Sequence, residues 1–246
     1  MYYLDLFSGL GGFALGAYWA GWRFDEYYFS EVDEYAIKVY RQRFPDAEAL
    51  GDITAIDTGD LPKGDWVITG GFPCQDISNA GKRKGIQGSR SGLWFEMWRI
   101  IRDLRPRWVI AENVGAITFR GLAVVLNSLA QIGYDAEWTD IRASDMGAPH
   151  RRERIWIVAY PYSKNIQRRF KQSRSYREQI RTMALPKTWQ TNESILSPSA
   201  LCRTSDGIPH RVERTKCLGN SIVPQIAELL FNQIKEVECF RMHKEK

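Results

Sequence analysis

Cysteine is scarce in this sequence, and the spacing of the few cysteines excludes two common kinds of site. The 246 residues include four cysteines, Cys74, Cys202, Cys217 and Cys239, and no two of them have the C-x-x-C spacing typical of a zinc site or a redox dithiol. We therefore predict no metal site and expect reduced thiols, of which Cys74 alone is a candidate for chemistry.

Long apolar runs are absent as well. No stretch reaches the roughly 20 residues of a transmembrane helix, and residues 1–5 lack the basic and apolar regions of a signal peptide. There is no tandem repeat or low-complexity array, and 44% of the residues are hydrophobic and 26% charged. These features predict a soluble, cytoplasmic protein without a membrane partner, built on one sizeable α/β core.

Basic residues are few at the start of the chain and concentrated later. Residues 1–60 hold 4 Lys or Arg against 11 Asp or Glu, a balance of −7, whereas the whole chain carries +5. The remaining residues therefore carry +12 and are the expected face for a polyanion, although an ordinary solvated surface can also be basic.

Strand-like and helix-like segments alternate along most of the chain. Strands are expected at residues 2–7, 26–30, 66–69, 108–111, 134–141 and 154–159, and helices at residues 14–20, 33–44, 93–104, 122–131 and 225–237. A glycine pair should end the strand at 66–69, residues 51–54 should close a further strand, and Ser221 should cap the last helix, with Pro224 in its first turn. This order predicts an α/β fold with a mostly parallel sheet and helices on both faces.

A glycine-rich turn follows the first expected strand. Its spacing, Gly9-x-Gly11-x-x-Ala14, is typical of a turn that brings backbone close to a nucleotide-bearing cofactor. Glu31 follows the second strand and can accept hydrogen bonds from ribose hydroxyls, and Asp52 can bond an adenine amino group. These features fit NAD, FAD and S-adenosylmethionine equally well.

Cys74 lies in the loop just after the strand at residues 66–69. Ligands of an open α/β sheet bind in the crevice beyond the carboxyl ends of the strands, and Pro73 with the glycines Gly70 and Gly71 would give this loop a defined shape. A thiol placed there is positioned to react, although a lone cysteine is more often a small buried hydrophobic residue.

Two polar motifs and two basic stretches complete the pattern. Glu112-Asn113-Val114 follows the strand at 108–111, and Arg152 and Arg154 share a face if their segment is extended. Arginines at alternate positions suit phosphate or carbonyl oxygens, and charged residues that protect an exposed strand edge are the alternative. Residues 81–92 are basic and glycine-rich, either a phosphate-binding loop or a plain surface loop. Residues 164–181 hold seven Lys or Arg against one acid, so we expect 161–210 to lie along nucleic acid, with a disordered linker as the alternative.

Taken in order, these motifs resemble those of the DNA (cytosine-5) methyltransferases, in the compact form familiar from bacteria and phages. The resemblance is carried by residues 5–12, Glu31, residues 51–53, 71–75 and 112–114, the Arg152-x-Arg154 pair and residues 219–221. It implies a Rossmann-like, S-adenosylmethionine-dependent methyltransferase fold with three parts. These are a catalytic and cofactor-binding domain at 1–160, a small basic target-recognition region at 161–210, and a segment at 211–246 that returns to the catalytic domain.

The resemblance implies a role for each matching position. The S-adenosylmethionine pocket would be lined by Phe7, Gly9, Leu10, Gly11, Gly12, Glu31, Val32, Asp52, Ile53, Pro73, Leu93, Asn220 and Ser221. The catalytic residues would be Cys74, Glu112, Asn113, Arg152 and Arg154. The residues contacting DNA would be Gln75, Ser78, Lys82, Arg83, Lys84, Arg90, Arg168, Arg169, Lys171, Arg174 and Arg177.

In the reaction that the resemblance implies, Cys74 adds to C6 of a flipped-out cytosine, and Glu112, with a raised pKa, meets the N3 edge of the base. Asn113 would hold the active-site strands together, and the two arginines would fix the base and the cysteine loop. The partner would be double-stranded DNA and the protein a monomer; the sequence does not decide whether a cognate restriction endonuclease accompanies it.

Three alternatives compete with this interpretation. A transfer RNA cytosine-5 methyltransferase would use the same site, but its Cys-Phe-Thr signature is absent, since residues 201–203 read Leu-Cys-Arg. A catalytically silent DNA- or partner-binding homologue would typically have lost motifs that are present here. A nicotinamide-dependent oxidoreductase has no need of the Pro-Cys-Gln and Arg-x-Arg elements.

The chain departs from the family pattern at two places. His150 stands where glutamine is common, and the variable region is short.

Overall fold

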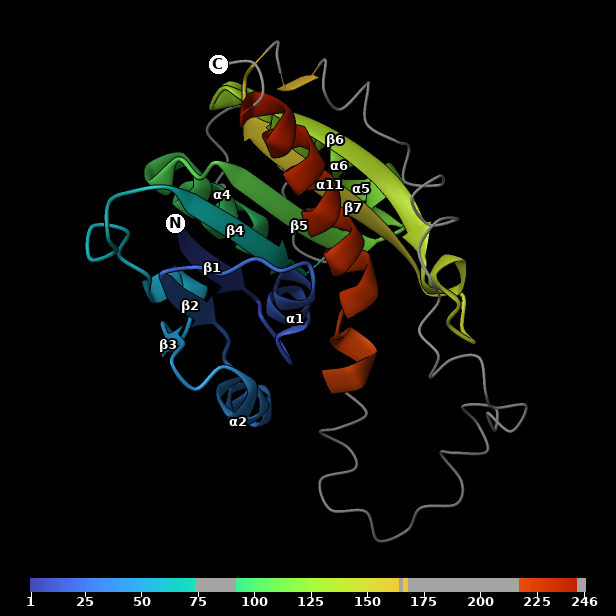
Figure 1. Ribbon diagram of the computed structural model, residues 1–246, viewed down its shortest axis with the longest axis horizontal. Coiled ribbons are helices and arrows are strands. Elements are labelled where there is room, and N and C mark those ends of the chain that lie inside the picture. Colours follow the sequence, from blue (N-terminus) through green and yellow to red (C-terminus); the bar gives the residue numbers. More distant parts are fainter. Residues whose placement is uncertain (74–91, 164–165, 168–216, 243–246) are drawn as a thin grey trace, which may run out of the picture.

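The computed structural model describes residues 1–73, 92–163, 166–167 and 217–242, and within them the fold is built on one seven-stranded sheet (Figure 1). The strand order is β3 (Glu48–Ala49), β2 (Glu26–Ser30), β1 (Tyr2–Leu6), β4 (Trp66–Gly71), β5 (Trp108–Val114), β7 (Glu153–Pro161) and β6 (Tyr134–Arg142). The strands from β3 to β5 run parallel, and β7 is antiparallel to both β5 and β6. The predicted α/β fold with a mostly parallel sheet is confirmed.

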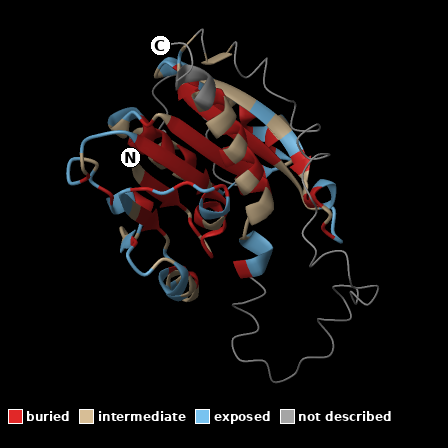
Figure 2. Cartoon of the chain, in the orientation of Figure 1, coloured by how far each residue is buried: buried red, intermediate tan, exposed pale blue. Residues whose placement is uncertain are grey.

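Helices cover both faces of the sheet. The helices α1 (Gly12–Trp19), α2 (Glu34–Arg43) and α11 (Pro224–Met242) pack on one face, and α4 (Leu93–Leu104) and α6 (Leu122–Gln131) pack on the other. Shorter helical segments are η1 (Ile53–Ala55), α5 (Ile117–Arg120) and η2 (Ala143–Met146). Because both faces are covered, the central strands are buried along almost their whole length (Figure 2).

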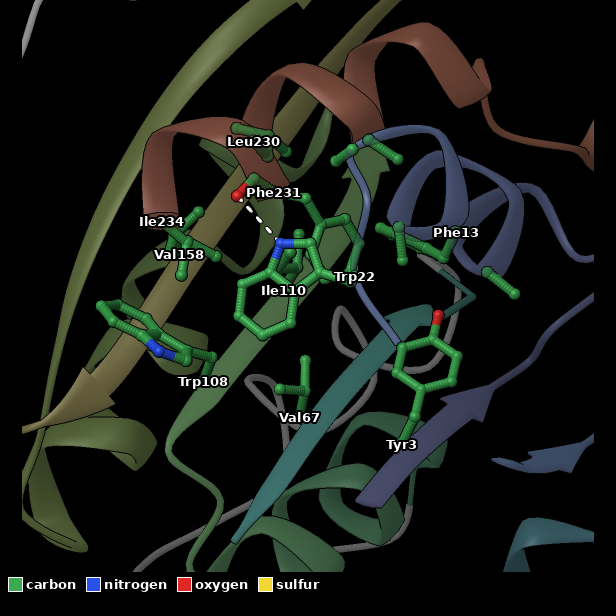
Figure 3. Packing of buried hydrophobic residues seen from close by; sticks show 14 of the residues in the cluster. Tyr3, Phe13, Trp22, Val67, Trp108, Ile110, Val158, Leu230, Phe231 and Ile234 are labelled. Atoms are coloured by element: carbon green, nitrogen blue, oxygen red, sulfur yellow. Dashed lines mark hydrogen bonds between the residues drawn. The ribbon is translucent and has the colours of Figure 1, made fainter. Parts of the chain in front are cut away.

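The C-terminal helix α11 is anchored across the sheet by buried aromatic residues (Figure 3). The indole Nε1 of Trp22 donates a hydrogen bond to the carbonyl of Phe231 at 3.2 Å. On β5, the indole Nε1 of Trp108 donates to Glu238 Oε1 at 2.7 Å. The last described helix is therefore an integral part of the core that the N-terminal strands begin.

Helices α1 and α11 approach closely because glycine faces the contact. A Cβ added at Gly16 would lie 2.5 Å from the Cβ of Ala227 and 2.7 Å from the carbonyl oxygen of Pro224. At Gly12, an added Cβ would lie 2.7 Å from Ile222. The shape of α1 therefore sets the position of the chain that enters α11.

We expect Gly16→Ala to destabilise the fold by about 1–3 kcal/mol, because the added methyl group has no room and the Pro224 carbonyl is backbone. Urea denaturation would measure the loss. Gly115→Ala is the matched control, since a Cβ there has nothing within 4 Å. Equal unfolding midpoints for the two variants would contradict this description of the helix contact.

Two local predictions differ from the structure, and a third is confirmed. The strand expected at 66–69 does not stop at the glycine pair but continues through Gly70 and Gly71 as part of β4. Glycine suits both positions because neighbouring side chains lie close: an added Cβ would be 3.1 Å from Met97 Sδ at Gly70 and 3.2 Å from Glu112 Oε2 at Gly71. The further strand expected before residues 51–54 is present as β3, which is two residues long, and Asp52 caps η1. The hydroxyl of Ser221 donates to the Ile222 carbonyl at 3.1 Å instead of capping α11.

Candidate active site

A cavity of about 500 Å³ opens at the carboxyl ends of the parallel strands. It is lined by residues at or just after the carboxyl ends of β1, β2, β3, β4 and β5, together with the start of α4, the start of β7 and the chain before α11. β7 contributes its first residues because it runs antiparallel, which brings its amino end to the same edge of the sheet. Such an edge is the usual ligand site of an open α/β sheet.

One wall of the cavity is organised around the carboxylate of Glu31. The Gly9 N–H donates to Oε2 at 2.8 Å, and the N–H groups of Val32 and Asp33 donate to Oε1 at 2.8 and 2.9 Å. Gly9 has φ of +52°, which is why glycine suits this turn. Three backbone donors fix the carboxylate after β2 and leave acceptor capacity for a ligand.

Asp52 forms the next part of the same wall. Its Oδ1 accepts hydrogen bonds from the Thr54 N–H at 2.9 Å and the Thr54 hydroxyl at 2.8 Å. These bonds, the backbone one first, lower the pKa of Asp52 below its ordinary value. The Ser30 hydroxyl donates to the Gly51 carbonyl at 2.7 Å and ties the turn before Asp52 to the end of β2.

Glu112 occupies the opposite wall and is only 7% exposed. Its Oε1 lies 2.8 Å from Arg154 Nε. The two side chains share a face because Glu112 pairs with Trp156 across β5 and β7, and Arg154 is two residues from Trp156. Burial raises the pKa of Glu112 to about 7, against the lowering effect of the nearby positive charges of Arg154 and Arg152.

Asn113 connects the end of β5 to the chain that leads to Cys74. Its Nδ2 donates to the Phe72 carbonyl at 2.7 Å, and its Oδ1 accepts from the Val114 N–H at 2.9 Å. Pro73 follows Phe72 and lines the cavity. The amide side chain therefore holds the last described residues before Cys74 against the strand that carries Glu112.

Arg152 differs from the extended arrangement considered for the arginine pair. β7 begins at Glu153, and Arg152 precedes it with φ of +29°. Its guanidinium does not lie on the cavity lining but donates to the carbonyls of Gly219 and Ser221. The prediction that the two arginines share one face of an extended strand is therefore wrong, because only Arg154 lies in β7.

The structure brings most of the predicted site residues together. The predicted residues that line the cavity are Phe7, Gly9, Glu31, Val32, Asp52, Ile53, Pro73, Leu93, Glu112, Asn113, Arg154 and Asn220. Four predicted cofactor residues, Leu10, Gly11, Gly12 and Ser221, do not line it. Gly11 and Gly12 instead leave room for Tyr40 and Ile222.

Sequence reasoning missed five lining residues, namely Ser30, Gly71, Phe72, Val114 and Gly219. Ser30 directly precedes the predicted Glu31, and the other four belong to the motifs at 71–75, 112–114 and 219–221, so assigning a role to every residue of each motif would have found them. Other predicted residues lie outside the described part of the chain: Cys74, Gln75, Ser78, Lys82, Arg83, Lys84, Arg90, Arg168, Arg169, Lys171, Arg174 and Arg177.

A buried polar chain lies behind the glycine turn. Thr69 Oγ1 donates to Asp5 Oδ1 at 2.8 Å, and the Tyr3 hydroxyl lies 2.8 Å from Thr69 Oγ1. Asp5 is fully buried. Burial raises the pKa of Asp5 from 3.8 to about 8, with hydrogen bonds acting in the opposite direction.

We expect Asp5 to make folding stability fall as pH rises. Because its pKa in the folded state is raised, its favourable contribution is complete below about pH 4 and is lost as pH approaches 8. Urea denaturation between pH 4 and 8 should therefore show a flatter pH dependence for Asp5→Asn than for the wild type. Glu112 gives a remaining slope of the same sign between pH 4.5 and 7. Identical slopes for wild type and variant would contradict the prediction.

In the ranges that the structure describes, no helix is long and apolar enough to cross a membrane. Among the same residues, no group of three or more His, Cys, Asp or Glu side chains is arranged to hold a metal ion. Cys217 is buried in the core. The charged residues that line the cavity are Glu31, Asp52, Glu112 and Arg154.

Curated relatives are similar to more than half of this chain. The type II methyltransferase M1.ScrFI of Lactococcus lactis subsp. cremoris is 40% identical over 161 residues, covering 64% of this chain and 41% of the relative. M.HhaI of Haemophilus parahaemolyticus is 32% identical over 222 residues, covering 88% of this chain and 66% of the relative. The chain thus spans about four tenths to two thirds of the length of these two relatives.

Solved structures share the fold. A putative DNA modification methyltransferase encoded within an E. coli prophage has a TM-score of 0.52 and 29% identity, covering 65% of this chain and 47% of that one. The S. pombe Dnmt2 methyltransferase has a TM-score of 0.55 at 21% identity, covering 70% and 55%, which shows a common fold alone. The model of the C-5 cytosine-specific DNA methylase family matches residues 1–199. The chain therefore belongs to the C-5 cytosine-specific DNA methylase family.

Proposed function

We propose that this chain transfers a methyl group from S-adenosylmethionine to C5 of a flipped-out cytosine in a specific DNA sequence. The observation that carries the proposal is that one cavity contains both Glu31 and Asp52 on one side and the Glu112–Arg154 pair on the other. A cofactor and a base bound in one cavity can meet directly. Membership of the cytosine-specific family supports the choice of base.

The residues of the Glu31 wall fit S-adenosylmethionine. Carboxylates at Glu31 and Asp52 suit the hydroxyl and amino donors of an adenosine, and Phe7, Ile53 and Leu93 offer apolar contact for its ring. A cavity of about 500 Å³ lies within the range of small-molecule sites. When bound, the cofactor supplies an electrophilic methyl group next to a positive charge.

Cys74 is the proposed nucleophile. It follows Pro73, a residue of the cavity lining, and the family resemblance assigns it the covalent role. Its thiolate adds to C6 of cytosine, which makes the neighbouring C5 a carbon nucleophile able to take the methyl group. Loss of the C5 proton to a base and expulsion of the thiolate then regenerate the free enzyme.

Glu112 and Arg154 are the proposed partners of the base. With a pKa of about 7, Glu112 is protonated often enough near neutral pH to donate a hydrogen bond or a proton to N3 as charge builds there. Arg154 holds the Glu112 carboxyl in one orientation through its 2.8 Å contact. The hydrogen bond from Asn113 to the Phe72 carbonyl holds the chain before Pro73 against β5, the strand that carries Glu112.

The proposed partner is double-stranded DNA, and the protein is proposed to act as a cytoplasmic monomer. Residues 1–160 and 211–246 would form one catalytic unit, which the packing of α11 on α1 supports. Residues 161–210 and the loop at 81–92 supply basic residues for the opened duplex. Opening is required because the cytosine ring is inaccessible within a stacked duplex.

Expression in a bacterial host that lacks cytosine methylation, followed by bisulfite sequencing of its genome, tests this function. We expect protected cytosines at one recurring sequence. An unmodified genome from cells that contain soluble protein would contradict the proposal. Modified transfer RNA together with unmodified DNA would instead identify the RNA-directed alternative.

A further inference from the structure

Arg152 binds two backbone carbonyls that lie 67 and 69 residues further along the chain. Its Nη1 donates to the carbonyl of Gly219 at 2.9 Å, and its Nη2 donates to the carbonyl of Ser221. The residue between these carbonyls is Asn220, which lines the cavity as Gly219 does. One guanidinium thus holds the two peptide groups that flank a cavity residue.

The segment held by Arg152 is fixed elsewhere mainly by packing. Ile222 contacts the face of α1 at Gly12, and Pro224 opens α11 against Gly16. On the other side, the Ser221 N–H donates to the Cys217 carbonyl at 2.8 Å. Between these anchors, the described side-chain contacts to the carbonyls of Gly219 and Ser221 come from Arg152.

Arg152 also influences the opposite wall of the cavity through its charge. Together with Arg154, it lowers the pKa of Glu112 against the stronger effect of burial. The left-handed backbone at Arg152, with φ of +29°, is a conformation that a bulky residue adopts only where its surroundings enforce it. Arg152 therefore acts on both the Gly219–Ser221 segment, through hydrogen bonds, and Glu112, through its charge.

We propose that Arg152 is a positioning residue that forms the cofactor wall at Asn220 by clasping the carbonyls of Gly219 and Ser221. The inference rests on the proposed function and assigns Arg152 to cofactor binding and not to the flipped base. A planar guanidinium can donate to two carbonyls at once in fixed geometry, whereas a lysine ammonium keeps the charge but not the fork. The two functions of the side chain can therefore be separated by substitution.

The test is Arg152→Lys in the full chain, with cofactor affinity measured by titration calorimetry using S-adenosylmethionine alone. Loss of one charge-assisted hydrogen bond predicts a Kd about tenfold higher. Because lysine keeps a positive charge near Glu112, cofactor affinity should fall by a larger factor than kcat at saturating cofactor. If protonated Glu112 is the active form, kcat falls at high pH as Glu112 loses its proton. In Arg152→Ala this fall should occur at a higher pH, since the pKa of Glu112 rises when a neighbouring positive charge is removed.

Arg151→Lys is the matched control, because Arg151 is 71% exposed and pairs with Glu153 on the surface. It should bind the cofactor like the wild type. Hydrogen exchange of residues 219–222 provides a second measurement that needs no turnover, and Arg152→Lys should accelerate it. Unchanged affinity and unchanged exchange in Arg152→Lys would overturn the inference. A wild-type protein that binds no S-adenosylmethionine would instead refute the proposed function.

Discussion

Replacing Cys74 with serine is expected to abolish methyl transfer while cofactor and DNA binding persist. A serine hydroxyl is far less acidic than a thiol, so it supplies too little anion to add to C6 of the ring. We expect kcat to fall by at least about 10⁴-fold, as when an enzyme loses its nucleophile. Transfer of a labelled methyl group to DNA measures the loss, and calorimetry with S-adenosylmethionine measures the retained binding.

Cys239→Ser is the matched control for this experiment, because it makes the same atomic change at a cysteine to which the site gives no role. It should retain wild-type turnover. Substantial turnover by Cys74→Ser would exclude the covalent route. Loss of cofactor binding as well would show that the substitution disturbs the fold and not the chemistry alone.

Replacing Glu112 with glutamine is expected to lower kcat/KM by about 10²- to 10⁴-fold, the usual contribution of a general acid. Glutamine keeps the size of the side chain and one hydrogen-bond donor group, but it has no proton to transfer to N3. The wild-type kcat/KM should fall as pH rises through about 7, because the protonated form of Glu112 is the active one. That high-pH limb should be absent in Glu112→Gln.

A pH series of kcat/KM for the two proteins, measured with a fixed DNA substrate, tests this assignment. Thiolate formation at Cys74 raises activity with pH, so the wild-type profile should be bell-shaped and the variant profile should only rise. If Glu112→Gln retains most of its activity or keeps the high-pH limb, then Glu112 is not the acid. Arg154, which contacts Glu112 in the same cavity, would in that case be the next candidate partner of the base.

The sequence predicted those parts of the fold that depend on local pattern. The apolar stripe from Leu93 to Leu104 and the following Pro106 gave α4 its observed bounds, and β2 also has the bounds expected. The spacing of Gly9 and Glu31 predicted that a backbone turn and a carboxylate lie together, and the structure joins them with a hydrogen bond of 2.8 Å. Periodicity and turn chemistry are sufficient for such features.

Features set by distant contacts could not be predicted in this way. Gly70 and Gly71 resemble a strand terminus in sequence, but β4 continues through them. The structure shows glycine there because space is short: Gly70 packs closely on Met97, and Gly71 packs on the Glu112 carboxylate. The donation from Arg152 to Gly219 spans 67 residues, and no local pattern encodes it. Contacts of this kind join elements that are far apart in the sequence, and only the folded chain shows them.

The central claim is that the Cys74 thiolate bonds to C6 of a cytosine held beside Glu112. DNA in which 5-fluorocytosine replaces cytosine tests it without knowledge of the target sequence, since fluorine at C5 cannot leave as a proton and the adduct cannot resolve. With S-adenosylmethionine present, mass spectrometry of the digested complex should find the methylated fluorocytosine nucleotide attached to the peptide that contains Cys74. Methyl transfer to ordinary DNA combined with no adduct, or with an adduct on another residue, would contradict the account.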